Sequence, residues 1–289
     1  MIDERIIPLM KTLGYYNGVI DELDRMQVPM LDRACYFGDG VYDVSFSRNH
    51  KIYALEEHVS RFFQSAARFR MQPRMTEEEL CTLLCELVQR LEDGELWVYF
   101  QLSRGTGFRT HAFLEKEESN LWIMIRPMPI KDTYKPMRCI SMEDTRFYHC
   151  NVKSLNLLPN VLATQATVEA GVGECILHRG ETVTECAHSN LSILKDGVLL
   201  THPANEMILA GTGRAHLLKA CRGFGIPVRE ECYTMKELME ADEVIITSAS
   251  ALCIPVCEVD GTPVGGKAPT ILRKLQDHLL GEFLRETEA

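Results

Sequence analysis

The sequence predicts a two-domain α/β protein. A chain of 289 residues is longer than one typical domain and too short for three. Amphipathic helices and short apolar strands follow one another in both halves. The proline-containing segment 127–136 separates the halves, so we expect it to link a smaller N-terminal α/β domain, residues 1–126, to a larger C-terminal domain, residues 137–289.

The first half contains two predicted helices and two predicted strands. Apolar residues at helical spacing predict a helix over residues 56–70. A second helix follows Thr76, which forms a capping box with Glu79, and it ends near Gly94. Short apolar runs rich in aromatic and β-branched residues predict buried strands at 96–102 and 121–125.

The second half has more elements and a mixed order. Helical periodicity and terminating glycines predict helices, and short β-branched runs predict strands. The predicted helices are 157–170, 213–223 and 269–286, and the predicted strands are 174–178, 191–194, 198–201 and 244–247. We find no internal repeat, so the two domains are expected to differ in plan.

Composition and charge exclude several classes of partner. The formal net charge is -10, and no block of Lys and Arg interleaved with aromatic residues offers a footprint for nucleic acid. The N-terminus is charged, and the short apolar run behind it is broken by Pro8, so it lacks the apolar core of a signal peptide. No apolar run approaches the roughly 20 residues of a membrane span. We therefore expect a cytoplasmic protein that contacts neither nucleic acid nor membrane.

Eleven cysteines are scattered through predicted helices and strands. They form no Cys-x-x-Cys pair, which argues against a disulfide framework and a zinc site. Cys81 and Cys85 lie four residues apart, as do Cys253 and Cys257, but neither pair has further ligands nearby in the sequence. We expect reduced, structural cysteines and no metal site.

One lysine has an unusual neighbourhood. Lys153 precedes an apolar run and lies in the block V-K-S-L-N-L-L-P-N. Lys11 also has apolar neighbours. These residues alone favour a lysine that lays its stem along an apolar surface with its amine in water over a catalytic amine.

The surrounding motifs resemble those of a known family. The block K-S-L-N-L-L-P-N at 153–160 and the block G-E-T-V-T-E at 180–185 resemble the cofactor lysine and the pyridine-nitrogen carboxylate of the fold type IV aminotransferases, which bind pyridoxal 5'-phosphate (PLP). The segments C-Y-F-G-D-G-V-Y-D at 35–43 and L-L-T-H-P-A-N-E-M-I-L-A-G-T-G-R at 199–214 resemble further family blocks. The resemblance implies a two-domain fold type IV enzyme with PLP between its domains, Lys153 as the lysine that binds PLP and moves the substrate proton, and Glu185 at the pyridine nitrogen.

The same resemblance implies a set of phosphate ligands. Arg61 matches the family arginine that pairs with the phosphate, although the local sequence also fits a salt bridge on a helix surface. Thr212 and Gly213 open a predicted helix, where backbone N–H groups and the helix dipole favour an anion. The turn Ser248-Ala249 follows a predicted strand.

Three segments depart from the family pattern. Thr212-Gly213 replaces a common Ile-Thr, and Ala249 replaces a frequent hydroxyl residue. The run 186–190 replaces a sequence richer in Gly and Ser, and for His188 within it we favour a packing or surface role. These changes bear on cofactor affinity and substrate range more than on the class of reaction.

A further segment bears on the handedness of the substrate. S-R-G-T-G-F-R-T-H at 103–111 resembles the segment of the D-amino acid aminotransferases in which an Arg-x-His pair from the neighbouring subunit, with a tyrosine, binds the substrate carboxylate. By resemblance the three residues are Arg109, His111 and Tyr42. A guanidinium suits a carboxylate because it donates two parallel hydrogen bonds, but the residues alone also fit a solvated loop.

The resemblance thus implies a homodimer that takes amino and keto acids, with D-alanine and 2-oxoglutarate giving pyruvate and D-glutamate. The rival interpretations are a branched-chain L-amino acid aminotransferase and an aminodeoxychorismate lyase-like PLP enzyme. From a different class, a PLP-binding protein without catalysis or a cysteine-based redox protein remains. If the protein belongs to that class, its match to the family at four catalytic positions has no explanation. These positions are Lys153, Glu185, Arg61 and Tyr42.

Overall fold

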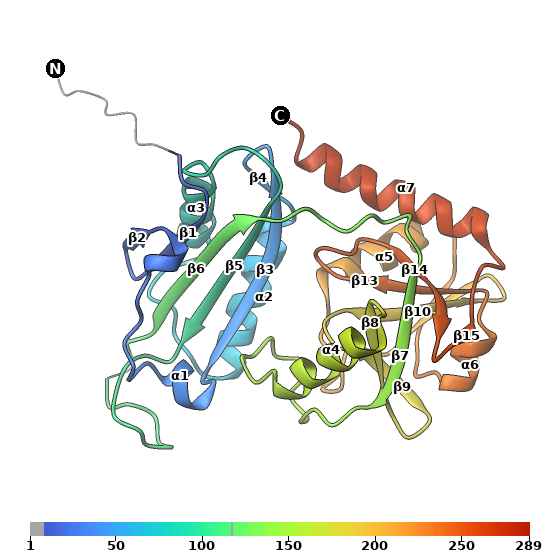
Figure 1. Ribbon diagram of the computed structural model, residues 1–289, viewed down its shortest axis with the longest axis horizontal. Coiled ribbons are helices and arrows are strands. Elements are labelled where there is room, and N and C mark those ends of the chain that lie inside the picture. The colour runs from blue at the N-terminus through green and yellow to red at the C-terminus, as the bar shows by residue number, and fades with distance from the viewer. Residues whose placement is uncertain (1–8, 117) are drawn as a thin grey trace. The chain divides into compact units, whose positions relative to one another are not determined.

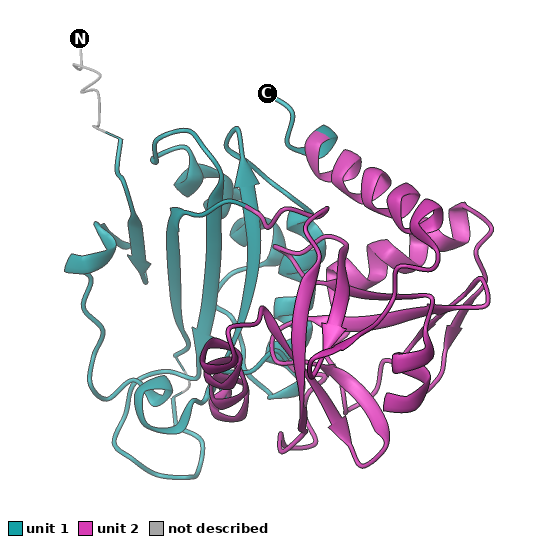
Figure 2. Cartoon of the chain, turned by 45° about the vertical axis from the view of Figure 1, so that its right-hand side comes forward, with its two compact units in different colours: residues 1–129, 153–156, 285–289 teal, residues 130–152, 157–284 magenta. Residues whose placement is uncertain are grey.

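The computed structural model describes residues 9–116 and 118–289. The chain divides into two compact units, coloured separately in Figure 2: unit 1 comprises residues 1–129, 153–156 and 285–289, and unit 2 comprises 130–152 and 157–284. Both units combine helices with a β-sheet, which confirms the α/β prediction. The N-terminal residues on which we argued against a signal peptide lie outside the described residues.

Unit 1 is built on a six-stranded antiparallel sheet in the order β2-β1-β6-β5-β3-β4 (Figure 1). Its strands are β1 (Leu13–Tyr16), β2 (Val19–Asp21), β3 (Gly40–Arg48), β4 (Lys51–Ile52), β5 (Leu96–Ser103) and β6 (Asn120–Pro127). Its helices are a 3-10 turn, η1 (Leu23–Arg25), the short α1 (Arg33–Phe37), α2 (Leu55–Arg68) and α3 (Glu77–Val88). The full pairing of β3 with β5 and of β5 with β6 makes these three strands the centre of the sheet.

Helix α2 covers the sheet because its apolar residues recur at helical spacing. Val59, Phe62 and Ala66 are fully buried on the side that packs against the sheet. The Phe62 ring meets that of Phe100 of β5 edge to face, with 5.1 Å between centroids. The predicted helix over 56–70 is therefore confirmed to within two residues at either end.

Helix α3 starts as predicted and ends earlier. Thr76 accepts a hydrogen bond from the Glu79 N–H, and the Glu79 carboxylate accepts one from the Thr76 N–H, so the capping box is present. The helix stops at Val88 rather than near Gly94, and that prediction was wrong. The reason is that Leu91, fully buried, pairs with Met10 in a bridge that a continued helix would forbid.

Unit 2 contains a nine-stranded mixed sheet. Its path runs β12-β11-β10-β13-β14-β7-β8-β9, with β15 paired to β14. The strands are β7 (Met137–Glu143), β8 (Glu174–Arg179), β9 (Thr182–Cys186), β10 (Asn190–Lys195), β11 (Val198–Thr201), β12 (Val228–Glu230), β13 (Glu243–Thr247), β14 (Ile254–Val259) and β15 (Thr262–Pro263). The helices are α4 (Leu158–Ala170), α5 (Thr212–Gly223), α6 (Met235–Glu240) and α7 (Pro269–Glu286).

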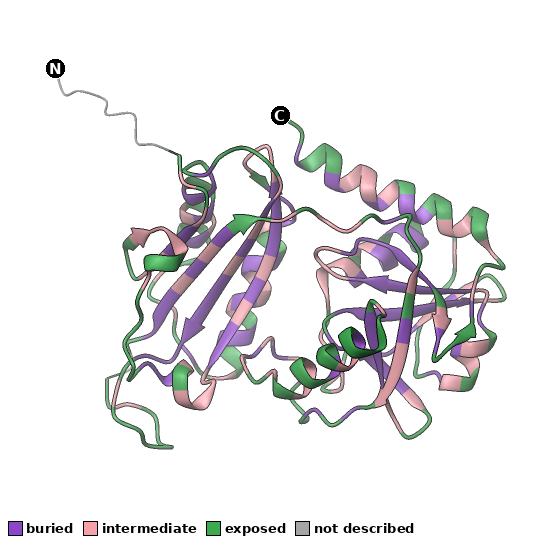
Figure 3. Ribbon diagram, in the orientation of Figure 1, coloured by how far each residue is buried: buried purple, intermediate pink, exposed green. Residues whose placement is uncertain are grey.

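The core of unit 2 lies on β10 and β13. Ile193, Val244 and Ile246 are at most 1% exposed and pack with Tyr233. Figure 3 shows these strands buried along their length, whereas α4 is largely exposed. Among the described residues, no helix is long and apolar enough to cross a membrane.

Candidate active site

Lys153 lies in a short segment that pairs with the start of β3. Its carbonyl accepts a hydrogen bond from the Tyr42 N–H at 2.9 Å, and its own N–H donates to the Ser65 hydroxyl at 3.3 Å. Residue 154 forms a bridge with Val41. The backbone of Lys153 is thus held by β3 and by α2, and its side chain is half-buried.

The amine of Lys153 faces an aromatic ring. Its Nζ atom lies 4.4 Å from the centroid of the Tyr42 ring. Tyr42 in turn stacks on Tyr99, with 5.4 Å between ring centroids, and burial raises the pKa of Tyr99 well above its ordinary value. An ammonium over a ring face is a favourable position, so the geometry fixes where the amine points. The structure therefore brings together two of the residues that the sequence selected.

Arg61 belongs to a buried network on α2 and β3. Its Nε and Nη2 atoms donate to the two carboxylate oxygens of Asp43, at 2.8 and 2.7 Å. His58 Nδ1 lies 2.8 Å from the same carboxylate. Burial alone would raise the pKa of Asp43, but Arg61 and His58 outweigh it and hold that pKa well below its ordinary value. The guanidinium is therefore fixed in direction by a permanently ionised partner.

Sequence reasoning missed Asp43 and His58. Two signals were available: Asp43 directly follows Tyr42 in the family block, and His58 precedes Arg61 by three residues, which places both on one face of a helix. Burial lowers the pKa of His58, so at neutral pH the imidazole is neutral and Arg61 is the cation of the network.

Arg109 and His111 lie on an exposed loop between β5 and β6. Both pack against Phe37: the Arg109 guanidinium lies 4.8 Å and the His111 ring 5.0 Å from the centroid of the Phe37 ring. Among the described residues, neither side chain forms a hydrogen bond or ion pair with Lys153 or Tyr42. The loop thus presents the two side chains together, at the surface of their own chain.

Glu185 is a buried carboxylate of β9 in unit 2. It accepts hydrogen bonds from Arg146 Nη1, from Asn190 Nδ2 at 2.8 Å and from the Leu209 N–H at 3.1 Å. Burial raises the pKa of Glu185 to about 7, and Arg146 opposes this effect only in part; the charge of Asp144 adds a smaller contribution in the same direction as burial.

Arg146 divides its hydrogen bonds between two carboxylates. Its Nε and Nη2 atoms donate to Asp144 at 2.9 and 2.8 Å, which leaves Nη1 for Glu185. Arg179 and Thr184 also donate to Asp144. Sequence reasoning missed Arg146, Asp144 and Asn190, and nothing in their local sequence distinguishes them from surface residues.

The two predicted phosphate turns lie against each other in unit 2. Helix α5 begins at Thr212 after an N-cap glycine without a side-chain cap. A Cβ atom on Gly213 would lie 3.0 Å from the carbonyl oxygen and 3.2 Å from the nitrogen of Ser248. Glycine therefore lets the start of α5 approach the turn at Ser248-Ala249 closely.

A hydroxyl group lies beside the position of Ala249. Ser250 Oγ is 3.4 Å from Ser248 Oγ, and Ser248 Oγ accepts a hydrogen bond from the Ala251 N–H at 3.0 Å. The turn thus keeps two hydroxyls although residue 249 has none. These donors, with the dipole of a 12-residue helix, fit a phosphate.

Asn190 connects this turn to Glu185. Its amide nitrogen donates to Glu185, and its amide oxygen accepts from the Gly211 N–H at 3.2 Å. A Cβ atom on Gly211 would lie 2.1 Å from that oxygen, so a side chain at position 211 would displace the Asn190 amide. Asn190 therefore supports both the Glu185 carboxylate and the turn before α5.

His188 and the cysteines take no part in this network. His188 Nδ1 lies 3.2 Å from the buried carboxylate of Glu174, and the imidazole is 47% exposed. All eleven cysteines are free. Within residues 9–116 and 118–289, no group of three metal-binding side chains is present.

Comparisons with known proteins identify the family. A family model for class IV aminotransferases matches residues 40–259. D-alanine aminotransferase of Staphylococcus haemolyticus is 37% identical over 272 residues, which cover 92% of this chain and 96% of that protein. The D-alanine aminotransferase of Bacillus licheniformis is 37% identical over 281 residues, covering 96% and 99%.

Solved structures show the same fold. The branched-chain amino acid aminotransferase of Escherichia coli matches with a TM-score of 0.85 and 23% identity, over 96% of each chain. That of Thermoproteus uzoniensis matches with a TM-score of 0.81 and 21% identity, over 95% of this chain and 96% of that one. The fold type IV prediction is confirmed, and the chain belongs to the class IV aminotransferases, a family of PLP-dependent enzymes.

Proposed function

We propose that this enzyme transfers the amino group of D-amino acids, with D-alanine and 2-oxoglutarate as the pair that gives pyruvate and D-glutamate. The observation that carries the proposal is the identity of 37–38% with D-alanine aminotransferases over more than 90% of the chain. The branched-chain enzymes have comparable folds but only 21–24% identity. The Arg109-Thr110-His111 segment favours the D-specific interpretation as well.

Lys153 is the proposed catalytic residue. PLP supplies the electron sink that makes the substrate α-proton acidic. The Nζ atom of Lys153 would attach the cofactor and, once released by the amino substrate, take the proton from the substrate α-carbon and return it to the cofactor side. The position of Nζ at the face of Tyr42 supports this role, because an amine held in one direction can remove the proton from one face only.

Glu185 is the proposed partner of the pyridine nitrogen. The carboxylate would accept a hydrogen bond from the protonated nitrogen and so favour the form that withdraws electrons. The raised pKa means that Glu185 takes up a proton more readily than an ordinary glutamate when Arg146 is its nearest cation. A further positive charge beside it would lower that pKa and hold the carboxylate ionised.

The remaining residues would hold the phosphate and the substrate. Backbone N–H groups at Thr212, Gly213 and Ala249, with the Ser248 turn, fit a phosphate by their donor chemistry and by the close approach at Gly213. Arg61 would add a bidentate cation.

Arg109 and His111 would bind the substrate carboxylate of the neighbouring subunit, with Tyr42 of that subunit. Their exposure, and the lack of a hydrogen bond or ion pair to Lys153 or Tyr42 among the described residues, support action in a partner chain of a homodimer. The eleven free cysteines support a reducing compartment, the cytoplasm.

A spectroscopic assay tests the substrate class. The purified, PLP-loaded protein should absorb in the visible range, and D-alanine should bleach this band while releasing pyruvate. L-leucine should leave the band unchanged. Bleaching by L-leucine and not by D-alanine would instead support the branched-chain interpretation, and a band that neither amino acid bleaches would contradict the proposed transamination.

A mixed dimer tests the shared site. Lys153→Ala and Arg109→Leu each inactivate their own homodimer under the proposal. In a random mixture, half of the dimers are mixed, and each has one intact site, so activity should return to about a quarter of the wild-type value. No recovery in dimers shown to be mixed would place Arg109 in the site of its own chain.

A further inference from the structure

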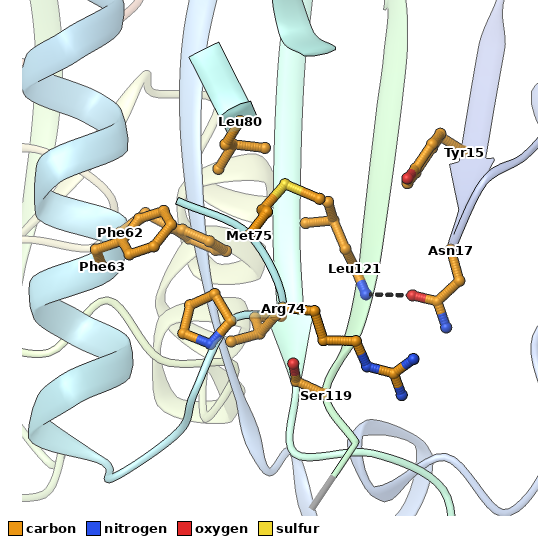
Figure 4. Close-up of a pocket in the computed structure, with 11 residues that line it drawn as sticks. Tyr15, Asn17, Phe62, Phe63, Arg74, Met75, Leu80, Ser119 and Leu121 are labelled. Carbon is orange, nitrogen blue, oxygen red and sulfur yellow. Dashed lines mark hydrogen bonds between the residues drawn. The ribbon is translucent and has the colours of Figure 1, made fainter. Parts of the chain in front are cut away.

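Unit 1 contains a cavity of about 190 Å³ beneath the segment that joins α2 to α3 (Figure 4). Apolar side chains from four elements line it: Phe62 and Phe63 of α2, Leu80 of α3, Leu102 of β5 and Leu121 of β6. Phe62, Leu80 and Leu102 are at most 2% exposed. The cavity therefore reaches into the core of the unit and is more than a surface depression.

The size and lining of the cavity suit an apolar group. Apolar cavities of about 150 Å³ stay dry and accept benzene, so 190 Å³ has room for one aromatic ring or a branched aliphatic chain. The lining residues do not include Lys153, Tyr42 or Arg61. The cavity is thus separate from the residues proposed to hold PLP in this unit.

Arg74 is the charged residue among those that line the cavity. Its Nη2 atom lies 3.1 Å from Glu118 Oε2, and the two side chains are 49% and 71% exposed. An ion pair this exposed contributes little to stability, so another carboxylate can replace Glu118 at small cost. Figure 4 shows the Arg74 side chain reaching past Ser119 on the side of the cavity where Asn17 lies.

Two other polar residues of the lining, Asn17 and Ser119, are already bonded to the protein. Asn17 Oδ1 accepts from the Leu121 N–H and Asn17 Nδ2 donates to Asn120 Oδ1, both at 2.9 Å. Ser119 Oγ donates to the Gln72 carbonyl at 2.8 Å. Asn17 and Ser119 therefore form a fixed rim. Arg74 is the charged group of the lining, so it favours a ligand with a negative charge.

We propose that this cavity is a second binding site, for a small monocarboxylate with an aromatic or branched aliphatic body. The apolar walls would take the body, and Arg74 would exchange Glu118 for the ligand carboxylate. A single guanidinium favours one carboxylate, which disfavours dicarboxylates such as 2-oxoglutarate. The site is independent of which amino acids the enzyme transaminates.

Helix α2 couples this site to the proposed cofactor residues. Phe62, at the wall of the cavity, follows Arg61 directly, and Ser65 of the same helix accepts the hydrogen bond of the Lys153 N–H. A ligand packed against Phe62 therefore bears on the helix that positions both groups. The ligand should change the affinity for PLP, and PLP should change the affinity for the ligand by the same factor.

Calorimetric titration of the PLP-loaded enzyme with 3-phenylpropanoate tests the site. This probe has neither an amino nor a keto group, so it cannot be transaminated. We expect one molecule per chain, with binding weakened about fivefold or more by Arg74→Met and strengthened about twofold by Glu118→Gln. The alcohol analogue, 3-phenylpropan-1-ol, should bind as weakly as the acid binds to Arg74→Met. Neither variant should change D-alanine turnover without the probe.

Two further variants separate this site from the substrate carboxylate site. Met75 lines the cavity and is half-buried, so Met75→Trp should fill it and abolish binding of the probe. Arg109→Leu, which removes the proposed substrate guanidinium, should leave binding unchanged. Binding that survives both Arg74→Met and Met75→Trp, binding that is lost in Arg109→Leu, or no binding at all would each overturn the proposal.

Discussion

Each unit buries a carboxylate against an arginine, and the two carboxylates differ in how readily they take up a proton. In unit 1, burial would raise the pKa of Asp43, but Arg61 and His58 hold it well below its ordinary value. In unit 2, burial raises the pKa of Glu185 to about 7 although Arg146 contacts it. Burial and one arginine are common to both, so neither accounts for the difference.

The difference lies in the partners of the two carboxylates: Asp43 has both Arg61 and His58, whereas Glu185 shares Arg146 with Asp144. Arg61 gives two hydrogen bonds to Asp43, whereas Arg146 gives two to Asp144 and one to Glu185. Two hydrogen bonds from Arg61, together with the contact with His58, keep Asp43 ionised, whereas the one from Arg146 does not outweigh the burial of Glu185. Asp43 thus stays ionised and holds the Arg61 guanidinium in one direction, whereas Glu185 takes up a proton more readily than an ordinary glutamate.

Breaking the ion pair of Asp43 and Arg61 should have the largest effect, and that effect is on stability. Asp43→Ala leaves Arg61, which is 14% exposed, without its carboxylate, and this should lower the free energy of unfolding by about 3–5 kcal/mol. Urea unfolding of both proteins measures the change. Glu118→Ala, which breaks an exposed pair, is the matched control and should cost under about 1 kcal/mol. Equal losses in the two variants would show that Asp43 has no special role.

Removing the charge of Glu185 should slow catalysis. Glu185→Gln keeps the shape of the side chain but cannot carry a negative charge, so kcat for D-alanine should fall about 10²–10³-fold. The Kd for PLP should rise by less than about tenfold, because the phosphate contacts remain. Stopped-flow bleaching of the cofactor band and a PLP titration measure the two quantities. A variant with full turnover would remove Glu185 from the pyridine nitrogen.

The same variant should reveal the raised pKa in a stability profile. A carboxyl group whose folded pKa lies above its unfolded value stabilises the fold below the unfolded pKa, near 4.5, and this stabilisation is lost as the pH rises through 7. The difference in unfolding free energy between cofactor-free wild type and Glu185→Gln should therefore change by about 3 kcal/mol from pH 4.5 to pH 7.5, to the disadvantage of the wild type. A profile that changes in the opposite direction would mean that Arg146 dominates.

The difference between apolar and polar buried faces also explains which elements could be predicted from the sequence. Helices α2, α4 and α7 were predicted to within two residues because each has a helical apolar pattern or a clear terminator. Strand β3 was not predicted, although it lies at the centre of its sheet. Its buried face carries Asp43, Ser45 and Ser47 in place of apolar residues, and Asp43 is satisfied by partners on α2. A pattern of hydrophobicity cannot detect a strand whose buried face is mostly polar.

The site residues divide in a similar way. Lys153, Glu185 and the residues of the phosphate turns were selected from the motifs that contain them. Arg146 and Asp144 were not, because their role comes from a contact with Glu185 across 39 residues of chain. Whether a carboxylate is near its pKa depends on how an arginine distributes its hydrogen bonds, and that is a property of the folded structure.

The smallest expected effect tests whether the sharing of Arg146 between Asp144 and Glu185 affects the pKa of Glu185. Asp144→Asn removes the carboxylate that competes for Arg146 and the charge that raises the pKa of Glu185, so that pKa should fall. An ionised Glu185 is the form that accepts a hydrogen bond from the protonated pyridine nitrogen, so the affinity for PLP should weaken as the pH falls. In Asp144→Asn this fall in affinity, the acid limb of the pH profile, should move to lower pH by about one unit or less. Glu143→Gln changes an exposed neighbour and should leave the limb in place. Fluorescence titrations with PLP from pH 5 to pH 8 resolve such a shift, and a limb that stays where it is in Asp144→Asn would show that burial alone raises the pKa of Glu185.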